Sequence, residues 1–398
     1  MNQGEFSLWI SGAALAAYAF WWTTFLRPWI KLKKIQRLEN GESSILNGST
    51  ESAPFKKQLT IIIPFRNESQ RISPLLESLT QLQFSGDLEV IFCNDHSTDN
   101  GTEIIQEWSD QQSFDIKILN ASPSEIGKKA ALAMGISHAT HSVILTTDAD
   151  CCFHPSNANE MLNALICNEA DLAIGRVDYL WVNDQLHNKK GRNNLLQVYQ
   201  QMENQALIAI GFAESQKHNA AVANGANLMF KKQALIDLGG YQGHEHIASG
   251  DDIFTLEKFI LSPVHKITYV QHPSATVYTP LETRWDSFFH QRMRWMKKTF
   301  LQKTQKTALK QVLVGLFMIF IWVMSAIAVL SAHYETLAFV WLGKLLVDSA
   351  GVHILLSNNK PNPICVLLAS AAQVLWLPAL AITSTWSKYQ WKNRQHTA

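Results

Sequence analysis

Two aspartates separated by a single residue could bind a divalent cation. Asp148 and Asp150 directly follow Ser142–Thr147, a short β-branched run that predicts a buried strand. Two carboxylates on one short turn can both reach a hard cation, Mg2+ or Mn2+, and the phosphates that it bridges. A solvated surface turn is the alternative, and the position after a buried strand favours the metal site.

Asp95 and Lys128 could hold a nucleotide. Asp95 stands at the end of Leu88–Cys93, where a carboxylate can accept hydrogen bonds from a base or a ribose. The alternative is an N-cap or Asx-turn for a helix that starts near Thr102. Lys128 and Lys129 follow a glycine and open an alanine-rich helix, so a cation and helix N-terminal amides could face a pyrophosphate. A solvated helix start is the alternative for these lysines.

Two more clusters carry groups suited to chemistry. Asp251 and Asp252 precede the apolar residues Ile253–Leu256, where paired carboxylates suit either helix capping or a general base that takes a proton from a hydroxyl. Gln291–Trp295, with the sequence QRMRW, is basic and aromatic and comes shortly before an apolar stretch. By itself, this segment could equally be an interfacial helix whose cations reach the headgroups.

The segments that must position these residues alternate between strands and helices. Leu59–Pro64, Leu88–Cys93 and Ser142–Thr147 predict buried parallel strands, and Ile72–Gln83 and Thr102–Trp108 have helical spacing of apolar residues. This order predicts a doubly wound α/β sheet. Polar residues follow each strand, where such a sheet presents its ligand crevice.

Long apolar stretches predict membrane helices. Leu8–Leu26, Val312–Ala332 and Pro363–Trp386 carry no charge, and each is close to the about 20 residues needed to cross hydrocarbon. Thr336–Leu356 is also apolar but carries a lysine and an aspartate. It could span, lie at the interface, or pack inside a helix bundle where ionisable groups pair. We therefore expect one N-terminal and two or three C-terminal spans.

Basic residues beside these stretches predict the orientation. The first residues, MNQGEF, lack the positive charges of a signal peptide, so we expect an uncleaved anchor. By the positive-inside rule, two basic runs hold the intervening domain in the cytosol and leave the N-terminus outside. The runs are Arg27, Lys31, Lys33, Lys34 and Arg37, and then Arg292, Arg294, Lys297, Lys298, Lys303, Lys306 and Lys310. We expect an integral protein of the bacterial inner (plasma) membrane.

The composition of the chain further narrows the classes of protein to which it could belong. Hydrophobic residues make up 47% of the chain and charged residues 17%, which is rich in apolar content for a soluble enzyme. The formal net charge of +1 gives no case for a nucleic-acid partner. The five cysteines have no CxxC spacing, and we expect inert thiols.

Changes in composition divide the chain into four parts. We expect a membrane anchor and basic flank at 1–39, a linker at 40–58, a cytosolic domain at 59–298, and a basic interfacial segment with C-terminal membrane helices at 299–398.

Five motifs in a fixed order carry a family resemblance. They are IPFRNE at Ile63–Glu68, NDHSTD at Asn94–Asp99, DAD at Asp148–Asp150, GDD at Gly250–Asp252 and QRMRW at Gln291–Trp295. Together they resemble the family 2 glycosyltransferases over roughly residues 59–298. The Q-x-x-R-W motif is similar to that of the membrane branch with cellulose, chitin, hyaluronan and poly-N-acetylglucosamine synthases and ceramide glucosyltransferases. The resemblance implies a GT-A fold with a mixed sheet and an inverting mechanism.

The resemblance also implies a role for each motif residue. By this resemblance, the nucleotide is bound by Pro64, Glu68 and Asp95, and its diphosphate is bound by Lys128. The metal is bound by Asp148 and Asp150. The catalytic base is Asp252, supported by Asp251, and the acceptor end and the diphosphate are contacted by Gln291, Arg294 and Trp295. KKAALAMGI at 128–136 lacks the glycine and asparagine of the family's K-A-G-A-L-N segment.

These features lead to a functional hypothesis with two alternatives. We expect a nucleotide-sugar donor, a lipid or saccharide acceptor, and transfer at the cytosolic face of the membrane. A channel for a growing polysaccharide needs more helices than are predicted here, so we expect transfer of one or few sugars, or an export partner for a polymer. The alternatives are a catalytically degenerate nucleotide-sugar sensor or scaffold, and a transporter subunit. The retained carboxylates disfavour the first, and the large polar domain disfavours the second.

Overall fold

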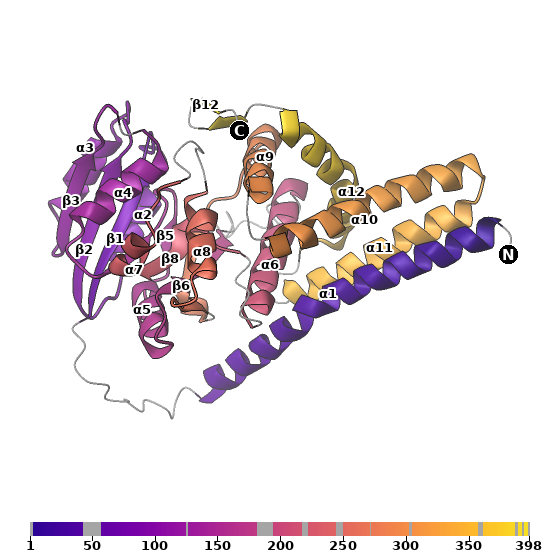
Figure 1. Ribbon diagram of the computed structural model, residues 1–398, viewed down its shortest axis with the longest axis horizontal. Coiled ribbons are helices and arrows are strands. Elements are labelled where there is room, and N and C mark those ends of the chain that lie inside the picture. Colours follow the sequence, from indigo (N-terminus) through magenta and orange to yellow (C-terminus); the bar gives the residue numbers. More distant parts are fainter. Residues whose placement is uncertain are drawn as a thin grey trace.

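The computed structural model describes most of the chain, and Figure 1 labels its elements. The described residues are 3–42, 57–124, 126–180, 194–216, 222–243, 250–270, 272–301, 305–356, 361–386, 389–391 and 394–396. Most of the predicted linker 40–58 lies outside them, as do the side chains of Arg37, Lys303, Lys306 and Lys310.

A seven-stranded mixed sheet forms the centre of the polar domain. Its order is β3-β2-β1-β4-β8-β6-β9, with β3, β2, β1 and β4 parallel, β8 antiparallel to both neighbours, and β9 parallel to β6. The bounds are β1 Gln58–Phe65, β2 Asp87–Asn94, β3 Asp115–Asn120, β4 Val143–Thr146, β6 Leu172–Ile174, β8 Leu228–Lys231 and β9 Ile267–Tyr269. The predicted strands and the doubly wound mixed sheet are confirmed.

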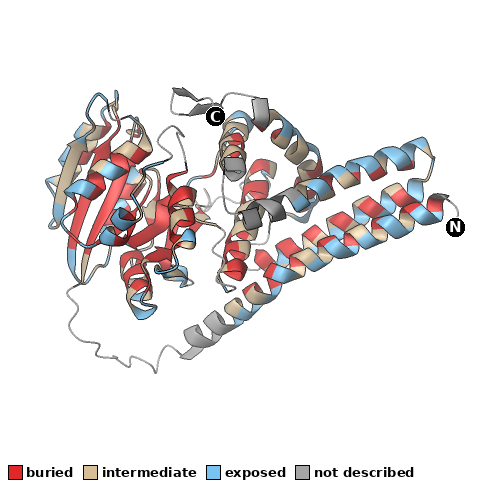
Figure 2. Cartoon of the chain, in the orientation of Figure 1, coloured by how far each residue is buried: buried red, intermediate tan, exposed pale blue. Residues whose placement is uncertain are grey.

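Helices cover both faces of this sheet. Successive side chains of a strand point to opposite faces, so Ile61 and Ile63 of β1 enter one apolar cluster and Ile62 enters another. The first cluster packs beneath α2 Ser73–Thr80, α3 Gly101–Ser109 and α5 Asn157–Cys167. The second packs beneath α4 Lys128–His138, α7 Lys232–Asp237 and α8 Asp251–Leu261. Figure 2 shows the strands buried between these layers, and α2 and α3 confirm the two predicted helices.

A second, smaller sheet and short helical turns complete the polar domain. The sheet has the order β5-β10-β7, formed by Cys152–Phe153, Thr276–Thr279 and Arg176–Tyr179. The 3-10 turns are η2 Gly225–Asn227 and η3 Pro273–Ala275, and a two-stranded sheet of β11 Tyr389–Trp391 and β12 Arg394–His396 lies near the C-terminus.

Long helices extend away from the sheet. They are α1 Gln3–Glu42, α10 Gln305–Leu330, α11 Tyr334–Leu355 and α12 Pro363–Trp386. In Figure 1, α1, α10 and α11 form an arm, and α12 packs on both α10 and α11 and on α9 Trp285–Leu301. Three segments of the described chain are long and apolar enough to cross a membrane: Leu313–Leu330, Tyr334–Leu355 and Pro363–Ser384. The N-terminal span Leu8–Leu26 lies within α1 and stays a prediction.

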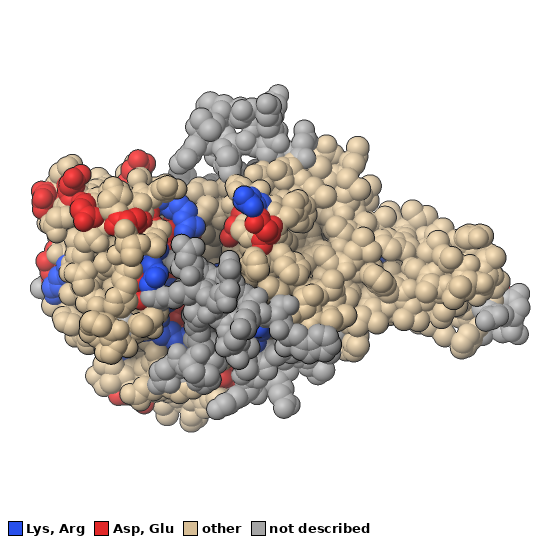
Figure 3. Space-filling model, turned by 90° about the horizontal axis from the view of Figure 1, so that it is seen from above, with Lys and Arg blue, Asp and Glu red and all other residues tan. Residues whose placement is uncertain are grey.

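The outer surface of the arm is apolar. Large side chains such as Leu316 and Trp322 of α10 and Leu342 and Leu346 of α11 are exposed. Figure 3 shows charged side chains over the polar domain, whereas the described surface of the arm is almost uncharged from this side. A contiguous exposed apolar surface of this kind is typical of contact with lipid or with another protein.

The lysine and aspartate of the fourth apolar stretch lie inside the helix bundle. Lys344 and Asp348 of α11 are buried and form an ion pair. Tyr18 of α1 donates a 2.7 Å hydrogen bond to Asp348, and Lys344 donates one of 2.9 Å to the hydroxyl of Ser370 in α12. The sequence left open whether Thr336–Leu356 spans, lies at an interface or packs in a bundle. In the structure α11 is apolar enough to span a membrane, and its ionisable groups pair within the helix bundle.

Helix α6, Leu195–Ser215, joins the polar domain to the long helices. Its residues Ala209 and Phe212 pack with Trp22 and Trp29 of α1 in a cluster that also contains Met318 of α10. The same helix contacts α11 and α12. The sequence did not predict α6, yet this helix packs the polar domain against the long helices.

Candidate active site

One cavity of about 300 Å³ lies at the carboxyl ends of β1, β2 and β4 and extends to α6, α8 and α9. Polar strand ends meet there because parallel strands present their carboxyl ends at one edge of a sheet. Every residue predicted for the site lines this cavity: Pro64, Glu68, Asp95, Lys128, Asp148, Asp150, Asp251, Asp252, Gln291, Arg294 and Trp295.

The end of the cavity beside β1 and β2 contains Pro64, Glu68 and Asp95. Asp95 is buried, and its carboxylate accepts a 3.0 Å hydrogen bond from the amide of Gly127. The capping alternative for Asp95 is wrong, because the N-cap residue of α3 is Asn100. This hydrogen bond connects the end of β2 to the loop that leads into α4.

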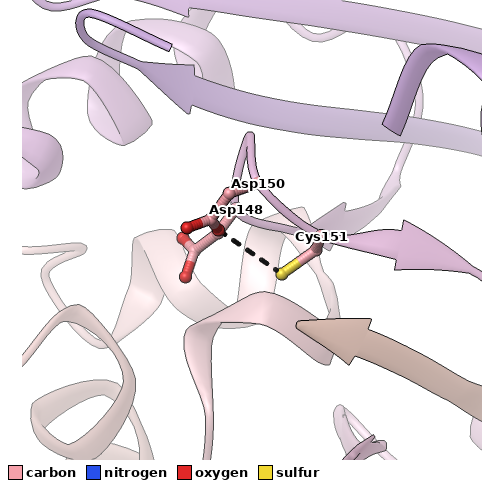
Figure 4. Close-up of side chains that lie close together, drawn as sticks. All are labelled: Asp148, Asp150 and Cys151. Atoms are coloured by element: carbon pink, nitrogen blue, oxygen red, sulfur yellow. Dashed lines mark hydrogen bonds between the residues drawn. The ribbon is translucent and has the colours of Figure 1, made fainter. Parts of the chain in front are cut away.

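The turn after β4 presents the two predicted metal ligands. Oxygen atoms of Asp148 and Asp150 and the sulfur of Cys151 lie within 4.8 Å of one another (Figure 4). Burial, and then the negative charges of Asp150 and Asp148, raises the pKa of Cys151 well above its usual value, so the thiol stays protonated. The two carboxylates remain as oxygen ligands, and this donor set fits a hard cation such as Mg2+ or Mn2+.

Lys128 connects carboxylates from two elements. Its Nζ lies 2.6 Å from Asp148 Oδ1 and 2.8 Å from Asp251 Oδ2. Burial alone would lower the pKa of Lys128, but Asp148 and Asp251 outweigh burial and hold the pKa well above its usual value. The solvated helix start is therefore the wrong interpretation of Lys128. Gly225 permits this arrangement, because a Cβ there would lie 2.5 Å from Asp251 Oδ2.

Asp251 and Asp252 begin α8 but do not act as its N-cap, which is Gly250. Asp252 Oδ1 accepts a 2.7 Å hydrogen bond from the amide of Ile253 and lies 3.5 Å from Lys298 Nζ. Burial would raise the pKa of Asp251, but Lys128 and Lys298 lower it below its usual value. Both carboxylates therefore stand at the cavity, and the capping alternative fails for Asp251.

The QRMRW segment lies on α9 and faces the cavity. Gln291, Arg294 and Trp295 line it, whereas Arg292 and Met293 are buried behind it. Gln291 Nε2 donates a 3.2 Å hydrogen bond to Glu282. Three residues of this segment therefore face the same cavity as the other motifs.

Several basic residues at this cavity were not predicted from the sequence as site residues. Arg66, Arg176 and Lys298 line it, and Arg71 Nη2 lies 2.8 Å from Glu68 with Nη1 3.6 Å from Asp150. Arg66 lies inside the IPFRNE motif and Lys298 follows QRMRW, so proximity to a motif could have identified both. Arg176 lies on the short strand β7, which has no motif.

Three comparisons relate this chain to known proteins. Residues 60–239 match the family model described as Glycosyl transferase family 2. A segment of 106 residues, 27% of this chain, is 39% identical to 27% of a 4,4'-diaponeurosporenoate glycosyltransferase from Staphylococcus aureus. A segment of 108 residues, 25% of this chain, is 34% identical to 32% of the dolichyl-phosphate beta-glucosyltransferase ALG5C from Trichomonas vaginalis. The matches thus span less than a third of either relative.

The fold has a solved counterpart. The mannosyltransferase PcManGT from Pyrobaculum calidifontis, solved in complex with GDP-Man and Mn2+, aligns with 95% of this chain over 99% of its own length. The TM-score is 0.50 and the sequence identity 19%. This chain therefore has a GT-A-like mixed α/β fold with an N-terminal helix and three candidate C-terminal membrane helices, and its residues 60–239 match the Glycosyl transferase family 2 model.

Proposed function

We propose that this chain is an inverting glycosyltransferase of the membrane Q-x-x-R-W branch. It moves a sugar from a nucleotide-diphosphate donor to a lipid or saccharide acceptor at the cytosolic face of a bacterial inner membrane. The observation that carries the proposal is the cavity that residues of all five motifs line together. The match of residues 60–239 to the glycosyltransferase family model supports it.

In this proposal the donor binds across the carboxyl ends of the strands. Pro64, Glu68 and Asp95 bind the nucleoside, and Lys128 faces the diphosphate. Asp148 and Asp150 hold a Mg2+ or Mn2+ ion, which supplies positive charge beside the departing diphosphate when bound. The similar mannosyltransferase was solved in complex with Mn2+, and this supports a metal requirement.

The chemical step uses Asp252 as general base. Asp252 takes the proton of an acceptor hydroxyl, whose oxygen forms a bond to the anomeric carbon of the donor sugar. The bond between that carbon and the diphosphate oxygen breaks on the opposite face, and the nucleoside diphosphate leaves with the electron pair. Configuration at the anomeric carbon is therefore inverted. Lys298 Nζ lies 3.5 Å from Asp252 Oδ1 and places a positive charge beside the proposed base.

The acceptor enters from the side of α6 and α9. Leu207 and Ile208 of α6 give the cavity an apolar wall, and the next residue, Ala209, packs against the long helices. This arrangement supports an acceptor with a lipid part. Two relatives are named for 4,4'-diaponeurosporenoate and dolichyl-phosphate, which also supports a lipid.

Asp252→Asn tests the proposed mechanism. Loss of a general base typically costs about 10²- to 10⁴-fold in rate and leaves ground-state binding largely intact. We expect normal affinity for the donor nucleotide, measured by calorimetry, and very slow transfer on the same preparation. A near-normal rate would remove Asp252 from the mechanism. Donor binding without any turnover by the parent chain would instead favour a degenerate sensor or scaffold.

A further inference from the structure

Arg292 is a buried arginine within the QRMRW segment, and it does not line the cavity. Its side chain is 3% exposed. Arg292 Nε donates a 2.6 Å hydrogen bond to Glu203 Oε2, and Nη2 lies 3.5 Å from the hydroxyl of Tyr179. Arg292 Nη1 donates to the side-chain oxygen of Gln291. Most of the guanidinium edge is thus used by protein partners.

The faces of the same guanidinium are also covered. Its carbon lies 4.1 Å from the ring centroid of Trp295 and 4.4 Å from that of Phe288. A planar guanidinium that stacks on two aromatic rings restrains the positions of both rings. Gln291, Trp295 and Tyr179 all line the cavity, so one buried side chain contacts three groups of its acceptor end.

Glu203 supplies the negative charge that this buried cation needs. Burial would lower the pKa of Arg292, but Glu203 outweighs it and raises the pKa. Glu203 comes from α6, which packs on the long helices, whereas Arg292 comes from α9. Glu203 also lines a second cavity of about 50 Å³ together with Asp348 and Gln373 of the membrane-side helices. The pair therefore stands where the membrane bundle meets the catalytic cavity.

We propose that Arg292 and Glu203 are positioning residues for the transfer reaction, holding Gln291, Trp295 and Tyr179 in the geometry that receives the acceptor. The inference rests on the proposed function and deepens it. Arg292 acts through its neighbours and touches neither substrate. Because the pair lies at the acceptor end, its loss should affect the transfer rate and the KM for acceptor, and should leave donor binding unchanged.

Arg292→Lys is the sharpest single change. Lysine keeps the charge and can still pair with Glu203, but it lacks the planar fork that reaches Gln291 and the face that stacks on Trp295. A displacement of about 1 Å in a positioned group can cost about 100-fold in rate. We expect kcat/KM for the acceptor to fall about 10- to 100-fold, with affinity for the nucleoside diphosphate within about twofold of the parent.

A double variant covers the case in which a single change prevents folding. Removing one partner of a buried ion pair leaves an uncompensated charge, whereas replacing both by apolar residues of similar size is often tolerated. Glu203→Leu with Arg292→Met should therefore fold and bind the nucleoside diphosphate, yet transfer slowly. Asp286→Asn is the matched control, because it breaks an exposed Arg284–Asp286 pair at the start of the same helix and should transfer normally.

The outcomes separate the two proposals. Parent turnover with unimpaired transfer by Arg292→Lys and by the double variant would overturn the positioning role alone. An equal loss of donor affinity and acceptor transfer would also overturn it, since the pair would then merely support the fold. A parent chain that transfers no sugar would overturn the proposed function, and the positioning role with it.

Discussion

Lys128 connects two carboxylates of the site that lie far apart in the sequence. Its place after a glycine at a helix start predicted a cation at the cavity, and this is where Lys128 lies. Its two carboxylate partners were not predicted, because Asp148 and Asp251 reach it only through the folding of β4 and α8. These contacts join Lys128, Asp148 and Asp251 in one network of ion pairs at the cavity.

The Lys128–Asp251 contact predicts a particular acid sensitivity. Lys128 and Lys298 lower the pKa of Asp251 in the folded chain, so the stabilisation that Asp251 contributes is complete above its unfolded pKa of about 3.9. That stabilisation is lost as pH falls through the lowered pKa. The difference in melting temperature between the parent and Asp251→Asn should be constant from about pH 7 to pH 5 and shrink below about pH 4.

Thermal unfolding of both chains in one detergent across this pH range checks the prediction. Asp237→Asn changes an exposed aspartate on α7 and should leave the melting temperature unchanged throughout. A difference that already shrinks at pH 6, or that persists undiminished at pH 3, would contradict the assigned direction of the shift.

Among elements, those with a long or strongly patterned sequence were predictable, and the short ones were not. β1, β2 and β4 carry β-branched runs followed by polar residues, so both the strands and the site residues after them could be read from the sequence. β6, β8 and β9 have three or four residues each, too few to display a period, whereas the equally short β4 is marked by the polar DAD motif that follows it. The pairing of Glu203 with Arg292 depends on how α6 lies beside α9, and no local pattern encodes that.

The packing of α1 on α11 depends on a glycine. A Cβ at Gly351 of α11 would lie 2.1 Å from the ring of Trp22 in α1, which is itself buried. Gly351→Ala should therefore force the two helices apart and destabilise the protein by about 1 to 3 kcal/mol. Gly315→Ala in α10 is the matched control, because a Cβ there meets no atom within 4 Å.

Melting temperatures in the same detergent measure both variants. Gly315→Ala should be neutral or stabilising by up to about 1 kcal/mol, since alanine favours helix over glycine. Equal destabilisation by the two substitutions would show that the close approach of α1 to α11 does not decide the outcome.

At the scale of the whole molecule, α1 and α11 run in the same direction along the arm, and the orientation predicted from charge stays a prediction. Ser7, Tyr18 and Lys33 of α1 contact Thr336, Asp348 and Leu355 of α11 in the same order, so the two helices run parallel. Their C-terminal ends lie beside the catalytic domain, and α10 returns in the opposite direction (Figure 1). A single membrane side for the catalytic domain is compatible with this arrangement.

Accessibility tags test that orientation. A tag at the N-terminus should react with a membrane-impermeant reagent applied to intact cells, and a tag within Asn40–Pro54 should react only after the membrane is opened. The reverse pattern would place the catalytic domain outside the cytosol and reject the role given to the basic runs.

Product analysis tests the central claim most directly. The purified full chain in lipid vesicles is given a panel of radiolabelled UDP- and GDP-sugars with Mg2+ or Mn2+, and extracted lipids and polymers are separated and counted. We predict that label from one donor enters one lipid or saccharide product, that a chelator abolishes the product, and that Asp252→Asn makes it very slowly. Bound donor with no labelled product from any sugar nucleotide would contradict the assignment as a glycosyltransferase, and undiminished product in the chelator would contradict its dependence on metal.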